Sequence, residues 1–162
     1  MSASQVSHDQ DQVKSWVKKA VSFYRGAGRQ IGLAEFMNPR GQFVRDDLYI
    51  FALDLDGIML AHPINNRFEG IDFLVFRDSD GRAFIHEIVE NAKNGTCGCT
   101  DYKWYNPISR EEMTKTVYYE NVDGVIICGG FYREEDHHSE QNKESGDEYP
   151  ENFFDLLKFL GA

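Results

Sequence analysis

The second half of the chain holds a cluster of aromatic and cationic side chains whose spacing is typical of paired β-strands. Tyr102 and Trp104 are two positions apart, so they share one face of a strand. Lys115 and Tyr119 share a face of the next predicted strand, and Tyr118 takes the opposite face. A lysine among phenol hydroxyls is a natural receptor for a small carboxylate, because charge-assisted hydrogen bonds bind the anion. A lysine on an edge strand that keeps the protein soluble explains the same residues, and residue types alone do not choose between the two.

The three cysteines do not form the framework of a disulfide-rich domain, because their number is low and odd. Cys97-Gly-Cys99 is a close pair in a predicted glycine-rich turn, a pattern compatible with metal binding or a redox switch. A zinc site of this kind needs a second pair at a matching spacing, and the sequence has none. We therefore expect Cys97 and Cys99 to be ordinary thiols in a loop. Cys128 lies in an apolar run and is expected to be a small core residue.

The remaining polar motifs do not assemble a metal centre or a catalytic site. Asp136-His-His138 lies in a charged segment without further ligands nearby, and the turns at residues 54–57 and 78–81 lack the ligand spacing of a calcium-binding loop. The sequence contains no common motif for phosphate, dinucleotide or zinc-protease chemistry. We therefore expect no cofactor, no metal and no enzymatic activity, and we favour a binding function.

Composition limits the class of protein. The chain has 162 residues, 17 Lys+Arg against 27 Asp+Glu and a net charge of −10, which argues against binding to nucleic acid or anionic lipid. Its hydrophobic content of 41% is too high for a disordered chain. No apolar run reaches the roughly 20 residues of a membrane span, and the first residues lack the pattern of a signal peptide. As written, the sequence predicts a soluble, cytoplasmic, single-domain protein without membrane insertion.

Helices and strands must hold the aromatic and cationic cluster in place. The periodicity of apolar residues predicts where these helices and strands lie along the chain. After a flexible N-terminus (residues 1–12), a long amphipathic helix begins at Val13 and breaks at residues 26–28. A second helix follows near residues 31–36. An Asp-Gly turn joins two strands into a hairpin, a third helix covers residues 84–92, and short reversals connect the last strands as antiparallel neighbours. The prediction is an α+β domain with one five-stranded antiparallel sheet and helices to one side; the predicted strands are 48–53, 58–62, 100–105, 114–121 and 125–132.

The C-terminal part differs from the rest. Residues 133–152 form a predicted acidic linker without apolar periodicity, and residues 153–162 form a short apolar helix. Residues 133–162 contain nine acidic and three basic side chains, so more than half of the net charge of −10 belongs to this segment. The apolar helix must bury its hydrophobic side, and we expect it to fold back on the domain, with a twin subunit or another protein as the alternatives.

Several blocks together resemble a known family. They are Leu48–Pro63 (LYIFALDLDGIMLAHP), Arg77–Phe84 after Gly70, Asp101–Pro107 (DYKWYNP), Lys115–Tyr118 (KTVY) and Gly129–Tyr132 (GGFY). In order and spacing they resemble the single Cache domains of the second type over residues 13–132. The resemblance implies a PAS-like fold, with an antiparallel sheet and a long N-terminal helix, that senses small extracellular metabolites. Ligands in this family are typically short carboxylates such as acetate, propionate, pyruvate or lactate.

The resemblance also implies the residues of a binding pocket. Carried over by position, Tyr102, Trp104, Lys115 and Tyr118 would line it, and His62 at the end of the second hairpin strand is a further candidate. Because Lys115 and Tyr118 point to opposite faces of a regular strand, both reach one pocket only if the strand twists or bulges, and Tyr119 is the reserve. For His62, a purely structural role that bonds a loop is an equal alternative.

The sequence departs from the family pattern at three points. Tyr105 replaces the proline usual after the tryptophan, the Cys97-Gly-Cys99 pair is unusual, and no membrane helix or output module is present in the sequence. We therefore expect a stand-alone sensor that binds a small carboxylate and signals through a protein partner or a homodimer, although related domains are usually periplasmic or extracytoplasmic. The alternatives are an interaction module that uses the acidic linker and the C-terminal helix, and a redox protein that uses Cys97 and Cys99.

Overall fold

The computed structural model describes residues 2–134. The acidic linker predicted for residues 133–152 lies outside the described residues from residue 135 on, as does the apolar helix predicted for residues 153–162. Within the described part of the chain, no helix combines the length and the apolar character that crossing a membrane requires.

The N-terminal helix is longer than the periodicity predicts. It begins at Ala3 because the Ser2 hydroxyl caps it by accepting a hydrogen bond from the Gln5 amide. Residues 3–12 are thus the first turns of this helix, where a flexible N-terminus was expected. The helix ends at Gly28, whose φ of 90° is in the region that favours glycine, and the predicted break is confirmed. The helical elements are α1 (Ala3–Ala27), α2 (Arg29–Phe36), the 3-10 turn η1 (Asn66–Phe68) and α3 (Phe84–Asn94).

The strands form one antiparallel sheet in the order β1-β2-β6-β5-β4, and β3 pairs with β2 beside this path. The sheet has six strands where the sequence predicts five, because the two residues of β1 add a strand too short to carry a periodic signal. The predicted hairpin is confirmed as β2 and β3. The strands are β1 (Val44–Arg45), β2 (Leu48–Asp54), β3 (Met59–Ala61), β4 (Cys97–Tyr105), β5 (Glu112–Val122) and β6 (Val125–Tyr132).

The start of β4 differs from the sequence prediction. Cys97, Gly98 and Cys99 were expected in a loop, yet they pair in register with Glu120, Tyr119 and Tyr118 of β5. Gly98 is suited to this place because a Cβ atom there would meet the Tyr119 ring and hydroxyl. Cys97 and Cys99 are free and exposed, and Cys128 is buried as predicted.

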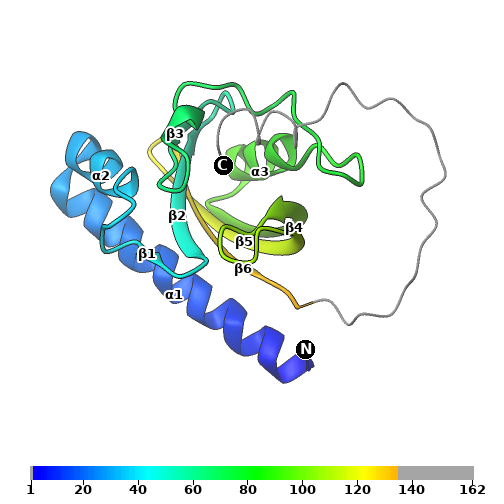
Figure 1. Cartoon of the computed structure of the whole chain (residues 1–162). Coiled ribbons are helices and arrows are strands. Elements are labelled where there is room, and N and C mark those ends of the chain that lie inside the picture. Colours follow the sequence, from blue (N-terminus) through cyan, green and yellow to red (C-terminus); the bar gives the residue numbers. More distant parts are fainter. Residues whose placement is uncertain (1, 135–162) are drawn as a thin grey trace.

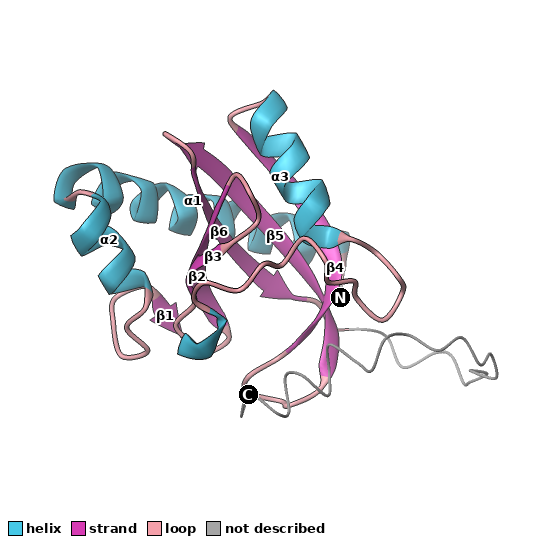
Figure 2. Cartoon of the chain, turned by 90° about the horizontal axis from the view of Figure 1, so that it is seen from above, coloured by secondary structure: helices cyan, strands magenta, loops and turns pink. Residues whose placement is uncertain are grey.

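The sheet separates two layers of core, so the helices do not all lie to one side as the sequence predicted. The long helix α1 crosses one face of the sheet, and α3 lies on the other (Figure 1). Figure 2, seen from above, shows the sheet between these two helices. Alternation along β5 directs Lys115, Val117 and Tyr119 toward the α3 face and Thr116 and Tyr118 toward the α1 face.

Candidate ligand-binding site

A small internal cavity lies between the sheet and the elements on its α3 face. Its volume is ≈ 10 Å³, and each lining residue is at most 6% exposed to solvent. The walls come from β2, β3, β4, β5, α3 and the loops between them. The lining residues are Tyr49, Phe51, Met59, His62, Phe73, Phe84, Ile85, Tyr102, Trp104 and Lys115.

Lys115 is the cation of this cavity. Its side chain is fully buried, and its Nζ has no hydrogen-bond partner among the described residues. The Nζ atom lies 4.0 Å from the centroid of the Tyr49 ring, 5.1 Å from that of Phe51 and 5.2 Å from that of Tyr132. Ring faces stabilise a cation but do not replace the hydrogen bonds that the ammonium group makes in water. The site therefore presents the N–H donors of Lys115 without an acceptor from residues 2–134.

The strand register explains why Lys115 reaches the cavity. It is paired with Tyr102 of β4 on one side and Tyr132 of β6 on the other, so all three side chains stand on the α3 face. The neighbouring glycine of β6, Gly130, leaves room for the lysine chain, because a Cβ atom there would lie 2.8 Å from the Lys115 Cε. Lys115 thus points inward from β5, which lies between β6 and β4 in the sheet. Because β5 is not an edge strand, the edge-strand interpretation of Lys115 is wrong.

His62 follows β3 and lines the cavity with its imidazole ring. Its Nδ1 accepts a hydrogen bond from the Asn65 amide at 3.2 Å, so a proton on the neutral ring belongs to Nε2. Burial lowers the pKa of His62 well below 6.5, and the positive charge of Lys115 lowers it further. The ring therefore stays neutral near pH 7, and it holds the following loop while it forms part of the wall. The loop-bonding role expected as one alternative is thus present, and the same ring lines the cavity; a role of His62 in binding a ligand stays a prediction.

Tyrosine hydroxyls form a short chain beside the lysine. The Tyr132 hydroxyl donates to the Tyr105 carbonyl at 2.9 Å, so it accepts the hydrogen bond from the Tyr49 hydroxyl at 3.3 Å. Tyr102 stacks on Phe84 with the ring centroids 4.2 Å apart. Burial raises the pKa of Tyr102 and Tyr132 well above 10, so both remain neutral phenols. Lys115 is thus the basic side chain among lining residues that are otherwise aromatic, aliphatic or, at His62, held neutral.

The structure gathers four of the six residues expected from the sequence around this cavity: His62, Tyr102, Trp104 and Lys115. Tyr118 lies on the other face, where its hydroxyl donates to Glu120 at 3.1 Å and Lys14 stands 5.7 Å from its ring centroid. β5 is regular here, without the twist or bulge that would have turned Tyr118 inward. Tyr119 shares the face of Lys115 but lies beside Asn91 of α3, outside the cavity lining.

The sequence did not assign the remaining aromatic residues of the cavity lining to the pocket. Tyr49 and Phe51 alternate onto one face of β2, and this signal was available in the pattern of residues 48–53. Phe73 lies in an irregular segment, for which periodicity carries no signal. Phe84 is the first residue of α3 and lies in the predicted third helix, although the sequence did not assign it to the pocket. Their rings lie 6.4 and 5.5 Å from that of Trp104, and they close the apolar side of the cavity.

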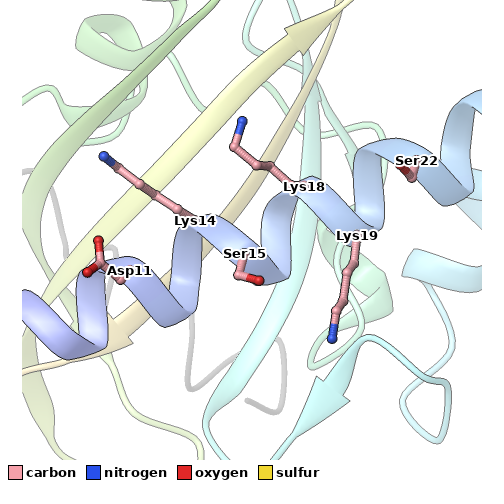
Figure 3. Close-up of a pocket in the computed structure, with 6 residues that line it drawn as sticks. All are labelled: Asp11, Lys14, Ser15, Lys18, Lys19 and Ser22. Atoms are coloured by element: carbon pink, nitrogen blue, oxygen red, sulfur yellow. The ribbon is translucent and has the colours of Figure 1, made fainter.

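The α1 face has hollows of a different kind. An open depression of ≈ 570 Å³ follows the outer side of α1, where Lys14 and Lys18 extend to one side of the helix and Lys19 to the other (Figure 3). A second hollow of ≈ 140 Å³ lies between α1 and the sheet, near Lys14, Cys99 and Tyr118. Lys18 pairs with Glu120 at 3.4 Å. Within residues 2–134 no three His, Cys, Asp or Glu side chains are grouped so that they could hold a metal ion.

The profile of the single Cache domain 2 family matches residues 5–144 of the chain. The methyl-accepting chemotaxis protein McpP of Pseudomonas putida is 34% identical over 88 residues, which are 53% of this chain and 16% of that protein. The sensor histidine kinase MctS of Rhizobium johnstonii is 32% identical over 77 residues, 48% of this chain and again 16% of the relative. The chain thus matches about a sixth of the length of these two proteins.

Two solved structures share the fold. A Cache chemosensory domain described as recognising carboxylic acids superposes with a TM-score of 0.69 at 26% identity, covering 83% of this chain and all of that one. A methyl-accepting chemotaxis protein from Vibrio parahaemolyticus has the same TM-score at 21% identity, covering 80% of this chain and 91% of that one. The two superpositions show that this chain, with its antiparallel sheet and long N-terminal helix, has a Cache-like fold.

Proposed function

The chain belongs to the single Cache domain 2 family, and we propose that it is a non-catalytic sensor that binds a short-chain monocarboxylate at the Lys115 cavity. In this proposal residues 13–132 form the sensor domain, and His62, Tyr102 and Trp104 contact the ligand together with Lys115. Tyr118 and Tyr119 belong to the fold around the site. No metal and no cofactor takes part.

The observation that carries the proposal is the buried Lys115 ammonium without an acceptor among the described residues. Leaving a buried charge without hydrogen bonds costs several kcal/mol, and a ligand carboxylate supplies both the charge and the acceptors. The walls carry no second cation near pH 7, which favours a monoanion over a dicarboxylate. The apolar rings of Phe73, Phe84 and Trp104 suit a short hydrocarbon tail.

Known proteins support the same ligand class. The Cache domain at 26% identity is described as recognising carboxylic acids, and the matched segments of the chemotaxis protein and the histidine kinase belong to signalling proteins. We infer that ligand binding here is read by a signalling partner. The alternative, an interaction module without a small-molecule role, uses residues 133–162, which lie outside the described residues from residue 135 on, and no observation within residues 2–134 favours it.

Ligand size bounds the affinity. Acetate has four heavy atoms, and at about −1.5 kcal/mol per atom its binding free energy does not exceed roughly −6 kcal/mol. This value corresponds to a Kd on the order of 10⁻⁵ to 10⁻⁴ M. One charge-assisted hydrogen bond contributes about 1.5–3 kcal/mol, a large part of that total. The site should therefore depend on Lys115 almost completely.

The test is calorimetric titration of the full chain with acetate, propionate, pyruvate and lactate. We expect wild type to bind at least one of them with a Kd of tens of micromolar or weaker, and Lys115→Ala to show no measurable binding while circular dichroism shows a folded domain. Lys14→Ala, a lysine on the other face, should bind as wild type does. Unchanged affinity in Lys115→Ala, or no heat with any of the four acids in wild type, would contradict the proposal.

A further inference from the structure

The cavity around Lys115 is largely closed to solvent. Its walls are almost completely buried, and its ≈ 10 Å³ hold about one water molecule. A carboxylate of four or more heavy atoms needs several times this volume. A wall must therefore move outward before a ligand reaches the Lys115 Nζ.

The wall with the least regular structure is the segment between η1 and α3. Residues 69–83 contain no helix or strand apart from one bridge residue, Asp72. Irregular segments of this length in a compact domain often cover a functional site. Phe73, near the start of the segment, and Phe84, directly after its end, both line the cavity. A movement of residues 74–83 would displace one or both of these rings.

The two halves of the segment are attached differently. The first half is tied to the β2–β3 hairpin by backbone hydrogen bonds, from Met59 N to the Ile71 carbonyl and from Phe73 N to the Gly57 carbonyl, each 3.0 Å long. Among the described residues, no backbone–backbone hydrogen bond joins the second half of the segment to a strand of the sheet. It is attached to β4 and its surroundings through side chains of Asp78, Ser79 and Arg82.

Asp78 is the most buried of these three, at 4% exposure. Its Oδ1 accepts from the Asp80 and Arg82 amides at 3.0 and 2.8 Å and shapes the turn, whereas its Oδ2 accepts from the Lys103 amide of β4 at 3.0 Å. β4 is the edge of the sheet, so the Lys103 amide points away from β5 and toward the segment. The residues on either side of Lys103 are Tyr102 and Trp104. The Asp78–Lys103 bond thus holds the segment on the strand that carries two aromatic walls of the cavity.

We propose that residues 74–83 open to admit the ligand and that the bond from the Lys103 amide to Asp78 is the latch that limits this opening. The inference rests on the proposed function, since it concerns access to the same cavity. Asp78 is a positioning residue that does not contact the ligand. A carboxylate that accepts an amide hydrogen bond out of contact with water forms one of the stronger single bonds in a protein, which suits a latch.

The latch has a kinetic signature. In this proposal the ligand enters and leaves through the same open state, and the bond forms again over the ligand once the rings of the wall have made room for it. Breaking the bond therefore raises the association and the dissociation rate constants by a similar factor, and Kd changes little. A residue that merely supports the shape of the cavity would raise the dissociation rate constant and Kd and leave association unchanged.

Two substitutions break the bond from opposite sides. Asp78→Asn keeps an oxygen for the turn amides but places an NH₂ group where Oδ2 accepts from Lys103. Lys103→Pro removes the amide hydrogen itself, and an edge position whose amide points outward tolerates proline. Lys103→Ala keeps the amide and is the matched control. Stopped-flow measurement of Trp104 fluorescence with acetate and propionate gives both rate constants.

We expect both rate constants to rise about tenfold or more in Asp78→Asn and Lys103→Pro, the factor for one charge-assisted bond, with Kd within threefold of wild type and of Lys103→Ala. Unchanged rate constants, or a raised Kd without faster association, would overturn the latch.

Amide hydrogen exchange tests the latch without ligand. The Lys103 amide should be protected in wild type and exchange rapidly in Asp78→Asn, while the Phe73 amide stays protected in both. Equal protection of Lys103 in both proteins overturns the latch, whereas failure of every carboxylate to bind wild type refutes the proposed function alone.

Discussion

Polar side chains of β5 differ between the two faces of the sheet in whether they find a partner. On the α1 face, the Thr116 hydroxyl donates to Asp101 and accepts from Arg133, and the Tyr118 hydroxyl donates to Glu120, which also pairs with Lys18. On the α3 face, the Lys115 ammonium is buried without an acceptor among the described residues. Paired polar groups are satisfied as parts of the fold, whereas an unpaired buried cation requires a further binding partner. Trp16 Nε1 on the α1 face and the Tyr119 hydroxyl are also buried without a partner among the described residues, but both are neutral groups, so Lys115 differs from them by its charge.

The two faces of the sheet also differ in how completely other elements cover them. One helix, α1, crosses its face of the sheet and leaves the start of β4 in contact with water, so Cys97 and Cys99 remain exposed. The other face is closed by α3 together with residues 69–83, and its side chains are almost completely buried. Water therefore reaches the side chains at the start of β4 on the first face, whereas it is largely excluded from the cavity on the second.

Thiol reactivity should show the largest contrast between the faces. Cys97 and Cys99 are exposed, whereas Cys128 on the α3 face is buried and its burial raises the pKa of the thiol far above its usual range. Since the thiolate is the reactive form, we expect Ellman's reagent to modify two thiols in the folded protein, orders of magnitude faster than the third. Cys97→Ser and Cys99→Ser should each remove one fast equivalent. A fast third thiol would show that the α3 face is open to solvent.

The same titration under oxidising conditions tests the redox alternative. Residues two apart in a strand are separated by roughly 6.6 Å and their side chains point in parallel directions, which is unfavourable for the close Cβ approach of a disulfide. We expect both fast thiols to persist. Loss of exactly this pair would revive the redox interpretation of Cys97 and Cys99.

The second largest contrast concerns the stability of the unliganded domain. Lys115→Met keeps the length of the side chain and removes a buried charge, so we expect the free energy of unfolding in urea to rise by about 1–4 kcal/mol. Lys14→Met changes an exposed lysine on the α1 face, and its effect should stay within about 0.5 kcal/mol. A loss of stability in Lys115→Met would mean that the ammonium group is satisfied in the folded chain, and the contrast between the faces would fail.

The sequence predicted most of the fold because the helices and the hairpin depend on local periodicity and turn residues. It predicted the residues of the site less completely. Tyr102 and Trp104 share a face by simple alternation, but Tyr118 was assigned to the pocket by family position against its own strand parity, and the regular register of β5 keeps it on the other face. The cavity wall at Phe73 depends on how an irregular segment folds over the sheet, and Phe84 reaches the cavity through the packing of the predicted helix α3 on the sheet. Both are properties of tertiary packing that no local pattern contains.

The pH dependence of stability provides a third contrast. Burial and the Lys115 charge hold the pKa of His62 well below its unfolded value of 6.5. Below pH 6.5 the unfolded chain therefore binds a proton that the folded domain does not, and the free energy of unfolding falls as the pH falls, with a slope of up to about 1.4 kcal/mol per pH unit. His62→Gln should flatten this slope between pH 6.5 and 5 in urea titrations. An unchanged slope would place the His62 ring in contact with water.

The smallest contrast is also the most specific, because it exchanges a single hydroxyl on each face. Tyr102→Phe removes a phenol oxygen from the cavity wall, and we expect the affinity for the bound carboxylate to fall by roughly five- to tenfold, the contribution of one hydrogen bond. Tyr118→Phe removes the bond to Glu120 on the other face; it should leave the affinity unchanged and lower the free energy of unfolding by about 1 kcal/mol or less. Calorimetry and urea unfolding of both variants measure the two properties side by side. If Tyr118→Phe weakens binding and Tyr102→Phe does not, the family position of Tyr118 outweighs its strand parity, and the ligand lies between α1 and the sheet, where the hollow near Lys14 and Cys99 would be its site.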